Sequence, residues 1–290
     1  MSVTLDFHTH GKITGSFPFC EDNFYKTVAE AKFNGIDSLA LTEHNRARNF
    51  EQAFEFLAAN YDYTGEYYKV DGIRVYTGTE VTTTEKYDIL FVGRREAVFE
   101  LRSGIMRESG GKHVLGTPAL LGLREFEDMA VILAHPFRGH DKSDILTNFS
   151  GLWERIDALE YNASDLCGSG FKAMEKMGKV GKIEKMEKDV CGRAPSELFD
   201  DGVRGMMAKV DELAGEVGLP VIGGSDSHHY LKIGSIATVL KGNAESAADI
   251  KAQIRDRNFE VRLSGDMRVK GMAHGLVKKL IKQAAGNQKL

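Results

Sequence analysis

The pattern of apolar and polar positions begins with a short strand-like run that ends in chemically active side chains. Residues 1–10 contain a short alternating run that suits a strand and ends in Asp-x-His-x-His at residues 6–10. Side chains two residues apart on a strand point the same way, so Asp6, His8 and His10 are expected to share one face. Two imidazoles and a carboxylate are a plausible half of a metal site, in which the carboxylate either ligates or fixes a histidine tautomer. A strand whose histidines face water fits this short pattern equally well.

The pattern continues as strands that alternate with helices. Apolar runs predict strands at 36–41, 72–77, 87–92, 129–134, 156–159, 219–222 and 259–263. Helical spacing predicts helices at 21–34, 50–59, 97–107, 123–128, 168–188, 203–217, 246–257 and 272–284. Because alternating strands and helices indicate βαβ units, we predict an α/β protein built on a parallel sheet.

Six of the apolar runs end in polar side chains that can carry chemistry. These are Asp6, His8 and His10, then Glu43 and His44, Glu80, His135, Glu160 and Asn162, and finally Asp226 and His228. Sites in parallel sheets and barrels form at the carboxyl ends of the strands, so these side chains are expected to converge. Five of the nine histidines occupy such ends, which is not the distribution of scattered surface histidines.

The types of these residues restrict the metal and the reaction. Imidazoles and carboxylates without a thiolate suit Zn, Mn or Fe. The donors outnumber what one tetrahedral ion can use, so two or three ions that share a carboxylate are expected. Glu80, the lone acid at the end of a middle strand, is the candidate bridge. Ions about 3.5–4 Å apart clamp a phosphoryl group and lower the pKa of a bound water. This chemistry favours hydrolysis of a phosphate ester by metal-bound hydroxide.

Five motifs in this chain resemble those of the PHP (polymerase and histidinol phosphatase) family. They lie at residues 6–10, 42–44, 78–81, 134–136 and 224–228, in the family's order, and the resemblance covers about residues 1–265. It implies a distorted (β/α)7 TIM-like barrel with a cluster of two or three ions, and phosphomonoesterase or nuclease activity on nucleotides or short nucleic acids.

The resemblance also implies how the ligands are shared among the ions. One ion is surrounded by His8, His10, Glu80 and Asp226, a second is held by Glu80 and His135, and a third by His44 and His228.

The chain departs from the family pattern at three places. The second motif reads Thr-Glu-His where Thr-Asp-His is usual, so Glu43 is expected behind the ligands. Gly15 and Ser16 stand where the family has an acid or a histidine, which removes a ligand from the third ion. Asp88 stands where many members carry a histidine. We predict Asp88 as a ligand that favours the harder ions Mn or Fe; a solvated acid at a strand edge is the alternative.

Two further residues are candidates for catalysis. Arg138 follows His135 by three residues and is expected over the cluster, where a guanidinium can hold a phosphate bidentately. A surface ion pair is the alternative. His229 is a candidate general acid for the leaving group, or else an ordinary polar loop residue.

Composition sets the remaining limits. The net charge of −4 gives no sign of a surface that coats nucleic acid. Three cysteines without a CxxC spacing favour a reducing compartment, and no apolar run approaches the ~20 residues of a membrane span, so we expect a cytoplasmic protein without a membrane partner. We predict a barrel at 1–265 with a helical insertion around 168–200. The helical appendage at 266–290 is expected to pack on the barrel, or else to contact a partner or nucleic acid.

The sequence thus predicts a PHP-type phosphoesterase, either a phosphatase or an exonuclease-like enzyme. Its expected partner is a phosphorylated small molecule, a nucleotide or a short nucleic acid. Two alternatives remain. Barrels with His-x-His on the first strand also cleave C–N bonds, which allows a metal-dependent amidohydrolase. The missing acid at Ser16 allows a non-catalytic metal-binding module.

Overall fold

The strands form one sheet that curves into a nearly closed barrel. The computed structural model describes the chain except for residues 1, 12–17, 48–49, 179–194 and 288–290. Within the described part, the strands are β1 Val3–Thr9, β2 Ser38–His44, β3 Tyr67–Val70, β4 Ile73–Thr82, β5 Asp88–Gly93, β6 Met129–Ala134, β7 Ala158–Asn162, β8 Val221–Gly224, β9 Ile236–Leu240 and β10 Phe259–Leu263. Their order is β10-β9-β1-β2-β4-β5-β6-β7-β8, and β3 pairs with β4.

The two ends of this sheet approach each other. Thr9, at the end of β1, bridges to Ser227, just beyond β8. The backbone NH of Gly223 in β8 donates to the Thr238 hydroxyl of β9 at 2.8 Å. The predicted TIM-like barrel is therefore confirmed, as a distorted and not fully closed form.

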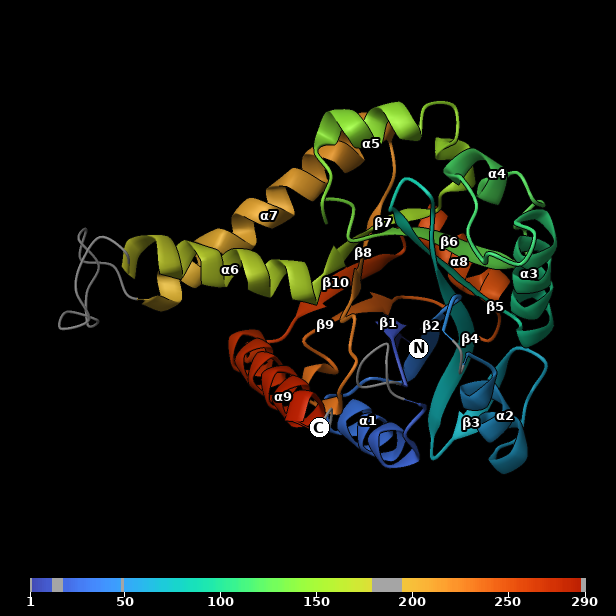
Figure 1. Cartoon of the computed structure of the whole chain (residues 1–290), viewed down its shortest axis with the longest axis horizontal. Coiled ribbons are helices and arrows are strands. Elements are labelled where there is room, and N and C mark those ends of the chain that lie inside the picture. Colours follow the sequence, from blue (N-terminus) through green and yellow to red (C-terminus); the bar gives the residue numbers. More distant parts are fainter. Residues whose placement is uncertain (1, 12–17, 48–49, 179–194, 288–290) are drawn as a thin grey trace.

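Helices surround the sheet, and one helical pair projects from it (Figure 1). The helices are α1 Glu21–Phe33, α2 Phe50–Asn60, α3 Arg95–Glu108, α4 Thr117–Leu121, α5 Lys142–Asn148, α6 Ala163–Gly178, α7 Pro195–Val217, α8 Ala247–Arg255 and α9 Met267–Asn287, with short 3-10 turns η1 Trp153–Arg155 and η3 Tyr230–Lys232. α6 and α7 extend together as an arm, and α9 lies at the outside of the barrel near α1.

Two apolar clusters hold the sheet between them. The larger cluster joins the helices to the outer face of the sheet, for example through Phe24 and Phe54. The second cluster joins side chains of strands that are distant in the sheet order, such as Tyr76, Ile132 and Ile222, so it fills the barrel interior. α8 belongs to this second cluster through Ile250 and Ile254 and packs against β6.

The sheet is mixed, so the expectation of a parallel sheet is wrong for part of it. β5 runs antiparallel to both β4 and β6. β9 likewise runs antiparallel to both of its neighbours, β1 and β10. The link from Thr82 to Asp88 is too short for the crossover of a dozen or more residues that a parallel connection requires. As a result Asp88, the first residue of β5, lies beside Ala134 at the edge where the parallel strands end.

Some helix predictions need correction. The helix expected at 123–128 is absent: that stretch is a loop, and a short helix precedes it at Thr117–Leu121. Pro118 suits the first turn of that helix because it lacks the NH that would be unpaired there, and Gly122 ends it. α9 begins at Met267 and not at 272. Of the predicted insertion, α6 and α7 are described, whereas 179–194 lie outside the described residues.

Two expectations about composition can be compared with the described residues. Cys20 and Cys167 are free thiols, and Cys191 lies outside the described part. No helix in the described ranges is long and apolar enough to cross a bilayer. The predicted domain division at 265 stays a prediction.

Candidate metal centre

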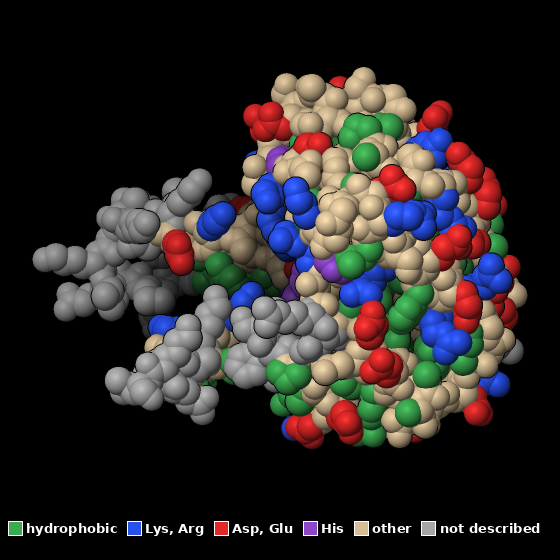
Figure 2. Space-filling view, turned by 45° about the vertical axis from the view of Figure 1, so that its right-hand side comes forward, with side chains coloured by type: hydrophobic (Ala, Val, Ile, Leu, Met, Phe, Trp, Pro, Cys, Tyr) green, Lys and Arg blue, Asp and Glu red, His purple; other side chains and the backbone are tan. Residues whose placement is uncertain are grey.

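The eight residues predicted as metal ligands lie together at one end of the barrel. Three of them lie within strands: His8 in β1, His44 in β2 and Glu80 in β4. Asp88 is the first residue of β5. The others follow strand ends within four residues: His10 after β1, His135 after β6, and Asp226 and His228 after β8. Their donor atoms form overlapping groups within 4.8 Å of one another. Figure 2 shows histidine side chains at the surface beside a group of Lys and Arg side chains, where the barrel meets the α6–α7 arm.

The Glu80 carboxylate is at the centre of the cluster. Its Oε1 lies 3.1 Å from Nε2 of His135 and 3.5 Å from Nε2 of His8. Its Oε2 lies 2.7 Å from Nδ1 of His44 and 3.5 Å from Nε2 of His10. Each carboxylate oxygen thus faces two imidazoles, which is the arrangement that a carboxylate bridging two ions requires.

Spacing and unpaired donors in the cluster fit bound cations. Oδ1 of Asp226 lies 3.8 Å from Nε2 of His8 and 3.7 Å from Nε2 of His10, too far for hydrogen bonds. Two donors each about 2.1 Å from one tetrahedral ion are about 3.4 Å apart. Within the described ranges, Nε2 of His8 and both ring nitrogens of His10 are buried without a hydrogen-bond partner. Buried polar atoms rarely remain unpaired, and divalent cations would satisfy these.

Glu160 supports the cluster from behind. Its Oε1 lies 2.8 Å from Nδ1 of His8. Its Oε2 accepts the backbone NH of His135 at 2.9 Å and the side-chain amide of Asn162 at 3.0 Å. The carboxylate therefore favours a proton on Nδ1 of His8 and leaves Nε2 to face Glu80 and Asp226. The sequence shows Glu160 only as an acid at the end of a predicted strand. That position is the signal in the sequence for this supporting role.

Asp6 belongs to none of the metal-binding groups found within the described residues, and its carboxylate is turned to backbone NH groups. The pairing of β1 with β2 shifts between Asp6 and Thr9. Oδ1 of Asp6 accepts the backbone NH of Ser225 at 2.9 Å and that of His8 at 3.3 Å. Burial raises the pKa of Asp6 to about 6 despite these hydrogen bonds. Asp6 thus ties β1 to the loop after β8.

Glu43 is likewise turned to the backbone. Its Oε1 accepts the backbone NH of Gly11 at 2.5 Å, so it anchors the chain just after His10. Glu43 belongs to none of the metal-binding groups found within the described residues. Gly15 and Ser16 lie outside the described residues.

Two of the predicted ligands have an unusual backbone conformation. His135 and Asp226 have φ values of 28° and 50°, in the left-handed region that residues with a side chain rarely adopt. Such a conformation costs about 1–3 kcal/mol and persists where the surrounding structure imposes it, often at functional sites. Both residues lie directly past a strand end, where this turn changes the direction of the side chain.

The electrostatics keep three of the donors, Glu80, Asp226 and His10, in the forms that bind cations. Burial opposes ionisation of Glu80, but His44 and His8 hold its pKa well below the usual value. Burial likewise opposes ionisation of Asp226, and Lys232 and His8 keep its pKa well below the usual value. Burial, then the neighbouring His228 and His44, lower the pKa of His10, which therefore stays neutral. Carboxylates and neutral imidazoles are the states that ligate metals.

Arg138 lies at the rim of the cluster. Its Nη2 is 3.0 Å from Oδ2 of Asp226, 3.1 Å from Oδ1 of Asn162 and 2.8 Å from Oδ1 of Asp165. Burial opposes its charge, but Asp226 and Asp165 raise the pKa of the guanidinium, so it stays positive. Part of the side chain remains exposed. A cation therefore stands beside a predicted ligand at the entrance to the cluster.

The predicted acid His229 is placed differently from its neighbour His228. Its Nδ1 accepts the backbone NH of Leu231 at 3.4 Å, at the start of η3. It belongs to none of the metal-binding groups in the described part of the chain. Burial, then Lys26, lower its pKa. Its catalytic role stays a prediction.

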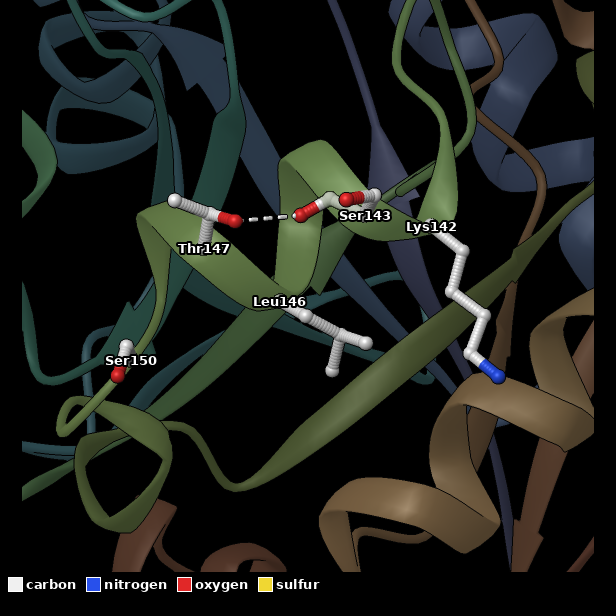
Figure 3. Close-up of a pocket in the computed structure, with 5 residues that line it drawn as sticks. All are labelled: Lys142, Ser143, Leu146, Thr147 and Ser150. Carbon is white, nitrogen blue, oxygen red and sulfur yellow. Dashed lines mark hydrogen bonds between the residues drawn. The ribbon is translucent and has the colours of Figure 1, made fainter.

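A surface hollow elsewhere does not compete with this cluster. It has a volume of about 660 Å³ and is lined by Lys142, Ser143, Leu146, Thr147 and Ser150 on and after α5 (Figure 3). The Thr147 hydroxyl there already donates to the backbone carbonyl of Ser143 at 2.8 Å. Because no group of convergent acids or imidazoles lines this hollow, the histidine cluster is the candidate site.

Several solved structures have the same fold. PsfC from Pseudomonas syringae PB-5123 has a TM-score of 0.67 at 16% identity, over 97% of this chain and 99% of that one. The lesion-specific endonuclease PfuEndoQ from Pyrococcus furiosus has a TM-score of 0.58 at 15% identity, over 90% of this chain and 58% of that one. An endonuclease Q complex with a 27-mer duplex substrate that carries an abasic lesion has a TM-score of 0.55 at 15% identity, over 88% and 57%.

These likenesses show the fold, and this chain spans little more than half of each endonuclease chain. A sequence search of curated proteins finds no match. Residues 208–259 match the model of a family described as PHP-associated. This match agrees with the barrel and with the five ordered motifs, and it supports the resemblance of the chain to the PHP family.

Proposed function

We propose that this protein is a metal-dependent hydrolase of phosphate esters. The observation that carries the proposal is the Glu80 carboxylate, whose two oxygens each face two imidazoles at 2.7–3.5 Å. Two or three divalent ions would be held by the eight clustered residues, His8, His10, His44, Glu80, Asp88, His135, Asp226 and His228. The resemblance to the PHP family and the match of residues 208–259 to a PHP-associated model support this class of reaction.

Bound divalent ions would polarise the phosphoryl oxygens and lower the pKa of water. The protein's own residues prepare the site for them. Glu160 fixes the tautomer of His8, and Glu80 is placed to join two ions. Arg138 supplies a positive charge at the entrance. A phosphate can replace the Asp226 carboxylate as a partner of its guanidinium.

The donor set supports Mn, Fe or Zn. Imidazoles with carboxylates suit these ions, and the oxygen donor of Asp88 favours the harder Mn and Fe. Oδ2 of Asp88 lies 3.7 Å from Nε2 of His135, within the group that also contains Glu80. We infer that Asp88 ligates the ion that Glu80 and His135 share.

The substrate class we propose is a phosphorylated small molecule, a nucleotide or a short nucleic acid. The endonuclease Q of similar fold was crystallised with a duplex substrate, which supports testing nucleic acid here. Whether the enzyme prefers monoesters or diesters depends on the loops around the cluster.

Metal analysis together with an ester screen tests the proposal. After metal-supplemented expression, we expect at least one Mn, Fe or Zn ion per chain and hydrolysis of p-nitrophenyl phosphate or its bis ester. Glu80→Gln should lower activity at least about a hundredfold, the upper end for residues that merely support ligands. Glu55→Gln, on the exposed side of α2, is the matched control.

Other outcomes would separate the alternatives. Fewer than one ion per chain would contradict the proposal. Faster hydrolysis of amides or lactones than of any phosphate ester would favour an amidohydrolase. Stoichiometric ions without turnover of any ester, with Glu80→Ala unfolding the protein, would favour a non-catalytic module.

A further inference from the structure

Helix α9 carries an apolar stripe that is open to solvent. Val269, Met272, Leu276 and Leu280 are 62%, 58%, 60% and 54% exposed. Their spacing of three and four residues places them along one face of the helix, over a length of about 16 Å. Among the described residues, only two other large apolar side chains are comparably exposed, and both are in α1.

The opposite face of α9 is anchored, so the stripe has a fixed position. Lys270 donates to the Asn34 side chain at 2.6 Å and to the carbonyl of Ile233 at 2.9 Å. At Gly271 an added Cβ would lie 2.7 Å from the sulfur of Cys167, so the helix approaches α6 closely there. Phe33, 85% exposed, directly precedes Asn34 and adds an apolar side chain near the start of α9.

The charge of α9 is opposite to that of the chain. Met267–Asn287 contains five Lys or Arg residues, of which Lys270 is buried, and no Asp or Glu, although the whole chain has 42 acidic and 38 basic residues. At 100° per residue, Arg268 and Lys279 fall beside Met272 along one border of the stripe. The helix thus presents long apolar side chains with positive charge along one border.

We propose that α9 docks the protein peripherally on an anionic lipid surface. A helix with an apolar face and basic flanks lies flat in the interface of a bilayer and is attracted by anionic headgroups. Nucleic acid would satisfy the lysines but offers no apolar surface along its backbone. In a dimer with two-fold symmetry, the basic border of one copy would lie near the basic border of the other. An extended peptide would need a groove on this protein, whereas the stripe runs along a single helix at the outside of the barrel (Figure 1).

This inference does not rest on the proposed hydrolysis. It concerns attachment to a surface and differs from the sequence-based expectation of no membrane partner, because exposure of the stripe is visible only in the folded chain. The helix does not span the bilayer, in agreement with the lack of a spanning helix in the described ranges.

Vesicle flotation of the full-length, metal-loaded protein tests the proposal. We expect binding to vesicles made from equal parts of phosphatidylcholine and phosphatidylserine, and at least about tenfold weaker binding to phosphatidylcholine alone. R268Q/K279Q, at the two basic residues along the border of the stripe, should weaken binding about 25-fold, at roughly fivefold per charge. L276E/L280E should abolish it. K112Q, at an exposed lysine after α3, is the matched control.

Circular dichroism and ester hydrolysis of each variant would show that the fold and the cluster are intact, so failure of docking is distinguishable from failure of the enzyme. Equal binding to both vesicle types, no binding to either, or binding unchanged in both double variants would overturn the proposal. A dimer that L276E/L280E dissociates would assign the stripe to a second copy. Duplex DNA binding that R268Q/K279Q removes, without vesicle binding, would assign α9 to nucleic acid.

Discussion

Replacing Glu160 by glutamine changes one atom and should weaken metal binding. The carboxylate accepts three hydrogen bonds, from Nδ1 of His8, from the backbone NH of His135 and from the Asn162 amide. A glutamine has one acceptor oxygen, so its NH₂ group must face one side of this arrangement. If the NH₂ group faced the backbone NH of His135 and the Asn162 amide, two hydrogen bonds would be lost. The glutamine is therefore expected to turn its NH₂ group toward His8.

The expected consequence is a change of tautomer at His8. With a donor facing Nδ1, the ring proton moves to Nε2, the nitrogen that lies 3.5 Å from Glu80 and 3.8 Å from Asp226. A protonated Nε2 cannot ligate a cation. Loss of such a supporting carboxylate typically costs 10–100-fold in metal affinity, which is about 1.4–2.7 kcal/mol.

Competition with a chromophoric chelator would measure this affinity for Mn and Zn. Glu160→Gln should bind the tightest ion about 10–100-fold more weakly than the wild-type protein. Glu108→Gln, at an exposed residue of α3, should leave it unchanged. Thermal unfolding of both apo variants would check that the fold is intact. Wild-type affinity in a folded Glu160→Gln protein would refute the reasoning about the tautomer.

Three further predictions concern pH, the rim of the site and the far edge of the sheet. Burial opposes the charge of His44 and His135, but contacts with Glu80 raise both pKa values above 6.5. The stabilisation of the apo protein by these two histidines is therefore complete below pH 6.5 and is lost as the pH rises through the raised values. Metal affinity should increase over the same interval, because only neutral imidazoles ligate. The melting temperature of the apo protein and the metal affinity, each measured at several pH values, should change in opposite directions. Arg138→Ala should lower kcat/KM for phosphate esters about tenfold or more, mainly through KM, and an unchanged KM would contradict phosphate binding. Asp157→Asn breaks a buried ion pair with Lys251 at 3.3 Å and should lower the free energy of unfolding by about 3–5 kcal/mol in urea titrations. Metal affinity of the folded protein should stay unchanged, because Asp157 precedes β7 and lies at the edge of the sheet opposite the cluster.

The sequence by itself determined which strand ends carry the donors. Apolar runs that stop at His44, His135 and Asp226 are local patterns, and the rule that such ends share one edge of a sheet predicts that they meet. It also determined the α/β class, because alternation of strands and helices needs no knowledge of distant contacts.

Tertiary structure decided the details that depend on pairing across the chain. The antiparallel direction of β5 places Asp88 at the carboxyl edge, and the approach of the loop after β8 gives Asp6 the backbone NH of Ser225 as a partner. Glu160 supports His8 across 152 positions of sequence. Periodicity reports only the neighbours along one segment, whereas the partner of a buried carboxylate is set by which strands pair and in what register.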